Sequence, residues 1–226
     1  MSGGLHTQLL DLACGAFLLA AVLVLWRREL AAIVRVFALQ GVALAALAVL
    51  LGAHDARWDL IGVGVGIGVL RAGVAPHLMR RALTVLTADR AHREEARETQ
   101  PLVNVAASLL TAALLTLLAY AVARPLTALN PTPATQALPV GLAVVLIGFF
   151  VLVTRRRAVA QVVGFLLLDN GITATALLAT SGVPLIVELG VSFDVLLAVL
   201  VLQILTTRMR EAFGTTDLDD LRELHD

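Results

Sequence analysis

The sequence contains no lysine, a single cysteine and few aromatic residues, and these scarcities exclude several classes of protein. Cys14 alone can form neither an internal disulfide nor a cysteine-held metal cluster. Aromatic residues make up 4% of the 226 residues, too few for the aromatic girdles of a membrane β-barrel. The five histidines are scattered, and no nucleophile–base pair, cofactor fingerprint or metal-ligand spacing is present. The sequence therefore predicts no metal, no cofactor and no catalytic residues of its own.

The charge balance argues against nucleic acid as a partner. All 17 positive side chains are arginine, and 17 acidic residues balance them. A nucleic-acid-binding face needs an excess of positive charge that this balance does not provide. Positive and negative residues alternate in the charged run at 88–100, as is typical of a solvated helix or loop.

What the sequence has in abundance is apolar residues. They make up 59% of the chain, and the mean hydropathy is +0.90, well above the values of ordinary soluble domains. The apolar residues form stretches of about twenty residues, the length of a membrane-spanning helix. We therefore predict an all-α polytopic transmembrane bundle of about seven helices, at 8–26, 30–52, 60–79, 102–123, 138–154, 158–179 and 184–206.

The arginines predict the orientation of this bundle. Thirteen of them fall in loops on one side, at 26–29, 80–100, 155–157 and in the tail after 207, whereas only Arg57 and Arg124 fall on the other side. The positive-inside rule then places the N-terminus outside and the C-terminus in the cytoplasm. We predict a multi-pass protein of a bacterial plasma membrane, with no cleavable signal peptide.

A weak internal repeat divides the chain. Residues 27–50 align with 156–179, which brings Gln40 opposite Asp169, and residues 70–83 align with 193–206, which brings Arg71 opposite Asp194. The two units lie four helices apart, so they share one membrane orientation and form a parallel repeat. The predicted domains are an N-terminal three-helix unit at 1–81, a loop and linking helix at 82–137, a C-terminal three-helix unit at 138–207, and a tail at 208–226.

Four polar residues fall near the middle of the predicted spans: Gln40, Arg71, Asp169 and Asp194. An ionisable group at this depth costs several kcal/mol unless it is paired, hydrated or used in transport. We predict that the four form one polar layer that serves as a proton or ion pathway. A static ion pair is the alternative, and the sequence leaves open whether Arg71 would pair with Asp169 or with Asp194.

Four further residues belong to this hypothesis. Glu188 lies near the outer end of the last predicted helix and is either a mouth of the pathway or a hydrated helix end. Asn170 and Gly171 are predicted to pack helices, since amides hydrogen-bond between helices and glycine permits close approach. Pro76 is predicted to kink the third helix about one turn after Arg71.

The chain resembles a known family in the segments RRRAVAQVVGFLLLDNG (155–171), VELGVSFD (187–194) and FGTTDLDDLRELHD (213–226). These segments, with a basic residue and a proline five apart at Arg71 and Pro76, resemble the hydrogenase-4 component E family. Members of that family are membrane subunits of [NiFe]-hydrogenase and formate hydrogenlyase complexes. The three-helix unit is also similar to the K subunit of respiratory complex I and to the C subunit of multisubunit cation/proton antiporters.

The resemblance implies a role and a set of partners. It implies a non-catalytic membrane subunit of an oxidoreductase, bound to antiporter-like and hydrogenase-like subunits in the lipid bilayer. It also implies that Asp169 and Asp194 take part in proton movement, with Arg71 as the basic element. Three alternatives remain open at this point: a stand-alone small transporter, an antiporter subunit, and a structural scaffold. The sequence does not decide between protons and sodium ions.

Overall fold

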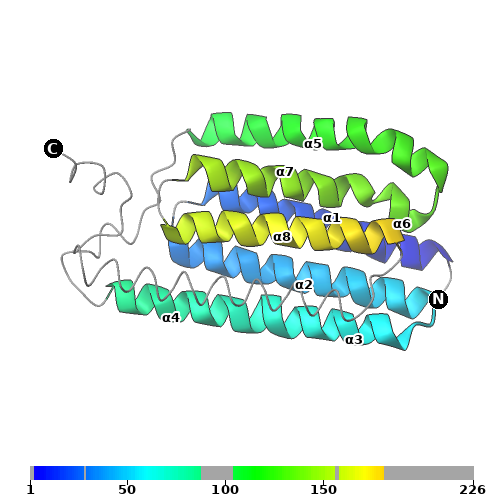
Figure 1. The fold of residues 1–226 in the computed structure, drawn as a ribbon, viewed down its shortest axis with the longest axis horizontal. Helices are drawn as coiled ribbons and strands as arrows, with labels where there is room; N and C mark the ends of the chain where they lie inside the picture. The colour runs from blue at the N-terminus through cyan, green and yellow to red at the C-terminus, as the bar shows by residue number, and fades with distance from the viewer. Residues whose placement is uncertain (1–2, 28, 88–103, 156–157, 181–226) are drawn as a thin grey trace.

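The computed structural model describes residues 3–27, 29–87, 104–155 and 158–180, and the regular elements in these ranges are all helices. Figure 1 shows them as a bundle of antiparallel rods. In chain order they are α1 (Gly3–Trp26), α2 (Leu30–His54), α3 (Trp58–Ile67), η1 (Gly68–Val74), α4 (Ala75–Thr87), α5 (Val105–Leu129), α6 (Pro133–Gln136), α7 (Leu138–Thr154) and α8 (Ala158–Thr180).

The predicted all-α membrane architecture is confirmed. Within the described ranges, six helical stretches are long and apolar enough to cross a membrane: Gly4–Trp26, Leu30–His54, Trp58–Arg81, Val105–Leu129, Pro133–Thr154 and Ala160–Thr180. They correspond one to one to the first six predicted spans. The seventh, at 184–206, lies outside the described residues.

Several helix ends differ from the prediction: α1 begins at Gly3 instead of 8, and α4 continues to Thr87 instead of ending at 79. Two further differences involve proline. The fourth predicted span ends at 123, but α5 continues through Pro125 to Leu129. A proline removes one helical hydrogen bond, yet membrane helices often continue past it. The fifth predicted span begins at 138, but the short helix α6 precedes it. The Thr132 and Thr135 side chains form a capping box around the first turn of α6, where Pro133 provides a favourable start.

The third span consists of three consecutive segments. α3 passes into the π-helical segment η1, which passes into α4 without a break in the chain direction (Figure 1). At the end of η1, the Ala75 N–H donates to the Leu70 carbonyl five residues earlier, as in a π-helix. Pro76 follows directly and has no N–H to donate. The sequence predicts a kink at Pro76; directly before it the structure has a π-helical segment that contains Arg71.

The helices pack around α2, which contacts α1, α3, η1, α4 and α8. The α7 and α8 helices form the most extensive pair, and α5 packs chiefly on α7 at one edge of the bundle (Figure 1). Leu, Ile, Val and Phe side chains fill the interior, among them Phe17, Phe37 and Leu44. The polar residues of the centre therefore lie in an otherwise apolar core.

Candidate functional site

Four polar side chains lie buried together where α2, η1 and α8 meet: Gln40, Arg71, Asp169 and Asn170. Their exposed fractions are 0%, 3%, 7% and 1%, respectively. We call these four residues the polar cluster. Gln40 lies near the middle of α2, Arg71 in η1, and Asp169 and Asn170 near the middle of α8. The cluster is therefore at the centre of the spans that carry it.

An ion pair forms the core of the polar cluster. Arg71 Nη2 lies 2.7 Å from Asp169 Oδ2, and Arg71 Nη1 donates a hydrogen bond to Asn170 Oδ1 over 2.7 Å. A guanidinium is planar and presents its donors in a fixed geometry. One arginine can therefore hold two consecutive residues of α8 at once.

Asn170 connects this ion pair to α2. Its Nδ2 donates to Gln40 Oε1 over 2.9 Å, while its Oδ1 accepts from Arg71. The Asn170 amide is thus both donor and acceptor in a chain from Gln40 to Arg71, and Arg71 continues the chain to Asp169. These contacts join three separate helices through side-chain interactions at one depth.

Glycine beside Gln40 allows α2 to approach Arg71 closely. A Cβ atom at Gly41 would lie 2.7 Å from the Arg71 carbonyl carbon and 2.8 Å from the Ala72 backbone nitrogen. Such distances are far below van der Waals contact, so a larger residue would push η1 away from α2. The absence of a side chain at Gly41 thus allows α2 and η1 to lie close enough for Asn170 to hydrogen-bond to both Gln40 and Arg71.

A second glycine holds α8 against α7. A Cβ atom at Gly171 would lie 2.5 Å from the Val145 backbone nitrogen. Asn170 directs its amide toward α2 and η1, whereas its neighbour Gly171 contacts α7. Small residues provide close packing where no hydrophobic effect drives helices together in lipid.

Some buried polar atoms next to these contacts have no hydrogen-bond partner in the described ranges. Gln40 Nε2 and Thr173 Oγ1 are among them, and Thr173 lies on α8 one turn beyond Asp169 and Asn170. Buried polar atoms are paired in roughly nine cases in ten. The polar cluster therefore has the capacity for further hydrogen bonds beyond those described.

Two of the other residues that the sequence singles out lie within the described ranges, and two lie outside them. Pro76 lies just after η1, and Gly171 lies at the α7–α8 contact. Asp194 and Glu188 lie outside the described residues, so the pairing seen for Arg71 is with Asp169. No group of three or more metal-binding side chains occurs in the described ranges.

Arg155 has a structural role in addition to its place among the arginines that predict the membrane orientation. Its side chain is buried, and Nη2 donates to the carbonyls of Val24 and Leu25 over 3.4 Å each. These carbonyls belong to the last turn of α1, where a positive charge is favourable. The run of three arginines gives no signal that one of them caps a distant helix.

Two further side-chain pairs lie at the end of the bundle that holds the start of α1. His6 and His54 stack with ring centroids 4.0 Å apart. Arg57 donates to Asp59 over 2.8 Å, and this hydrogen bond raises the pKa of Arg57 above its ordinary value. Arg57 therefore carries a full positive charge at this end.

A comparison with known proteins gives the chain a full-length relative. It is 52% identical over 226 residues to the uncharacterized protein Rv0085 of Mycobacterium tuberculosis, and the match covers 100% of both chains. The chain belongs to the Rv0085 family. No family model matches the sequence, and no solved structure matches it.

More distant relatives have a name that indicates a function. The chain is a distant homologue of hydrogenase-4 component E of Escherichia coli K12, with 32% identity over 115 residues. The match covers 51% of this chain and 53% of that protein. Hydrogenase-4 component E of Shigella flexneri matches to the same extent. The chain thus matches about half the length of these relatives, which confirms the resemblance seen in the sequence. With six apolar spans in the ranges that the structure describes, it is a multi-pass membrane protein.

Proposed function

We propose that the chain is a non-catalytic membrane subunit of a hydrogenase-4-like oxidoreductase complex, and that its polar cluster forms part of an intramembrane proton pathway. The observation that carries this proposal is the buried Arg71–Asp169 pair with its hydrogen bonds to Asn170 and Gln40. The homology to hydrogenase-4 component E supports the class of complex. Redox centres, on this proposal, belong to partner subunits.

Proton movement through the polar cluster requires Asp169 to alternate between two partners. A proton that reaches Asp169 neutralises the carboxylate and takes the place of Arg71 as its partner. Arg71 stays charged throughout, because a guanidinium does not release its proton in proteins, and it keeps the hydrogen bond to Asn170. When the proton leaves, the ion pair forms again. Arg71 thereby sets the energy of each protonation state without carrying the proton itself.

The amide groups of Asn170 and Gln40 keep the cluster polar during this exchange. Each amide has both donor and acceptor atoms, and Gln40 Nε2 and Thr173 Oγ1 remain available for further hydrogen bonds. The next proton carriers on this proposal are Asp194 and Glu188. Partner subunits would then supply the energy that drives protons along this array.

The decisive experiment replaces the carboxylate and measures proton movement. Membrane vesicles that contain the assembled complex receive hydrogen as electron donor and an artificial dye as electron acceptor, and a pH-sensitive dye reports proton uptake. Asp169→Asn should abolish turnover-driven uptake, whereas Asp169→Glu should retain it because the carboxylate is kept. Asp59→Asn is the matched control, because it makes the same chemical change in the exposed pair with Arg57.

Assembly has to be measured alongside transport, because loss of a buried partner can also destabilise the protein. Native gel electrophoresis of each variant reports the amount of assembled complex. Full proton uptake by an assembled Asp169→Asn complex would overturn the pathway and leave a static ion pair as the role of the cluster.

The membership in a complex has its own test. Affinity purification of the tagged chain from native membranes should recover antiporter-like and hydrogenase-like subunits in fixed proportion. The purified chain alone, placed in liposomes, should not transport protons or sodium ions. Transport by the isolated chain would instead establish a stand-alone transporter.

A further inference from the structure

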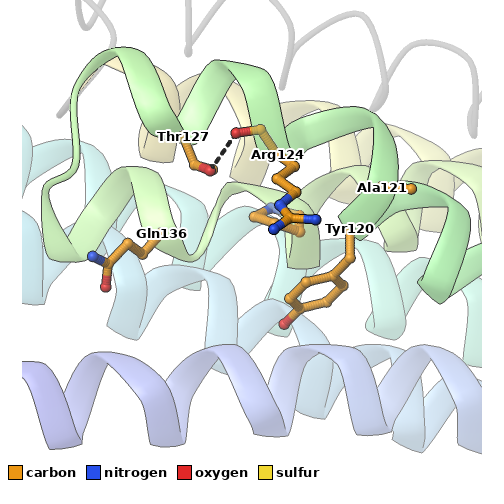
Figure 2. A pocket seen from close by; sticks show the side chains of 6 residues that line it. Tyr120, Ala121, Arg124, Thr127 and Gln136 are labelled. Atoms are coloured by element: carbon orange, nitrogen blue, oxygen red, sulfur yellow. Dashed lines mark hydrogen bonds between the residues drawn. The ribbon is translucent and has the colours of Figure 1, made fainter.

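A second polar site lies far from the polar cluster, where α5 ends and α6 leads into α7. A pocket of about 380 Å³ opens there, lined by Tyr120, Ala121, Arg124, Thr127, Gln136 and Pro139. Figure 2 shows the Arg124 guanidinium above the Tyr120 ring on α5, and Gln136 on α6 with its amide directed away from Arg124. We propose that the pocket binds the headgroup of an anionic phospholipid, with the phosphate on Arg124.

The first argument is charge. Arg124 is exposed, and no carboxylate in the described part of the chain forms an ion pair with it. Its planar donor group matches two oxygens of a phosphate. The Tyr120 hydroxyl and the Gln136 amide add donors from two different helices. An anion bound by Arg124 would therefore meet one cation, in a pocket whose lining also includes neutral donors on α5 and α6.

The second argument is depth. The lining residues of α5 lie in its C-terminal half, from nine to two residues before the end of the span Val105–Leu129. Tyrosine concentrates at the level of lipid headgroups, and Tyr120 is the single tyrosine of the chain. Arginine near the end of a membrane helix extends toward the same level. The pocket thus lies where lipid phosphates are found.

The third argument is access from the lipid. Only 17% of the apolar stretch of α5 is buried, which is the smallest share among the six described spans. Leu117, Leu118 and Val122, which precede or flank the pocket on α5, are 66%, 50% and 52% exposed. Acyl chains can lie along these side chains while the headgroup occupies the pocket. This favours a phospholipid over free phosphate as the ligand.

Pro125 adds an acceptor for the headgroup. Because proline has no N–H, it cannot donate the helical hydrogen bond to the carbonyl four residues earlier, that of Ala121. Ala121 lines the pocket. A headgroup that carries hydroxyl groups next to its phosphodiester, such as glycerol, could donate to this carbonyl. The chemistry of the pocket therefore favours phosphatidylglycerol over phosphatidylcholine, which has no hydroxyl donor and carries its own cation.

The test is native mass spectrometry of the full-length, delipidated chain titrated with dioleoylphosphatidylglycerol. Arg124→Gln should weaken binding of the first lipid about fivefold, the factor expected for loss of one cation at an anionic lipid surface. Tyr120→Phe keeps the ring and should weaken binding less. Arg57→Gln is the matched control, because Arg57 lies at the same end of the bundle and carries the same charge; it should leave binding unchanged.

Several results would overturn the proposal. Equal lipid binding by Arg124→Gln and the unmodified chain would exclude Arg124 as the phosphate ligand. An equal loss in Arg57→Gln would show general charge attraction instead of a site. Displacement of the lipid by inorganic phosphate at the same concentration would make the pocket a site for free phosphate, and equal binding of dioleoylphosphatidylcholine would exclude selectivity for anionic lipid. Circular dichroism and a single gel-filtration peak establish that each variant is folded.

Discussion

Arg71 contacts two consecutive residues of α8, and this arrangement makes the residues of the polar cluster energetically interdependent. Asp169 and Asn170 lie about 100° apart around a helix axis, yet the same guanidinium forms an ion pair with Asp169 and donates a hydrogen bond to Asn170. A change in one residue therefore leaves a buried polar group on another without its partner. Such groups give non-additive effects that double-mutant cycles can measure.

We expect Arg71→Met to destabilise the protein by about 3 to 5 kcal/mol, the usual cost of leaving one member of a buried ion pair alone. The double variant Arg71→Met/Asp169→Leu should recover much of this loss, because neither charge remains. Thermal unfolding in detergent measures both. A double variant that is as unstable as Arg71→Met would contradict a role of the ion pair in the loss.

Gly41 allows a prediction about the distance between α2 and η1. Gly41→Ala should cost about 1 to 3 kcal/mol, because the new Cβ would overlap the backbone of Arg71. Gly15→Ala is the control, since a Cβ at Gly15 meets nothing within 4 Å. It should be neutral or should stabilise α1 by up to about 1 kcal/mol. Equal effects of the two changes would show that the close α2–η1 contact does not limit stability.

At the scale of elements, the sequence predicts well which segments form membrane-spanning helices. It predicts poorly which side chains contact each other between those helices. Apolar stretches of sufficient length predict all six described spans, since length and hydropathy decide whether a helix can cross a membrane. The pairing of Arg71 with Asp169 could not be predicted, because it depends on which helices are neighbours and how each is rotated. The role of Asn170 in linking Arg71 to Gln40 depends on the same rotation.

The sequence also does not predict how a helix is distorted near a proline. Pro76 indicates an irregularity in the third span, but a kink and a π-helical segment both remove the strain of a missing N–H. At Pro125 the predicted helix end at 123 is wrong, because α5 continues through the proline to Leu129. In each case the packing of neighbouring helices decides how the backbone accommodates the proline.

Arg155 provides a prediction at the scale of an element. Arg155→Gln should destabilise the protein by about 1 to 3 kcal/mol, because charged hydrogen bonds to the buried end of α1 are lost. Arg35→Gln is the control, because Arg35 is exposed and its side chain bonds to its own helix. Unfolding in detergent measures both variants. If they are equally stable, Arg155 does not hold the end of α1.

The whole molecule has two ends, and the arginines predict which one faces the cytoplasm. Arg27, Arg81 and Arg155 lie at one end of the bundle, opposite the start of α1 (Figure 1). In a Cys14→Ala background, a membrane-impermeant maleimide added to intact cells should label Asp55→Cys. It should label Arg27→Cys only after the membrane is permeabilised. The reverse pattern would invert the predicted orientation.

The two faces of α8 have a consequence for the order of membrane assembly. The face of α8 that carries Gly171 packs closely against the backbone of α7, the preceding helix in the chain. The hairpin of α7 and α8 can therefore form as soon as α8 is inserted. Until α2 and η1 dock, Asp169 and Asn170 face surroundings that offer them no partner. Lipid provides no hydrophobic drive for docking. We therefore expect that the hydrogen-bonding needs of these two polar side chains, together with close packing, favour the docking of the α7–α8 hairpin on the earlier helices.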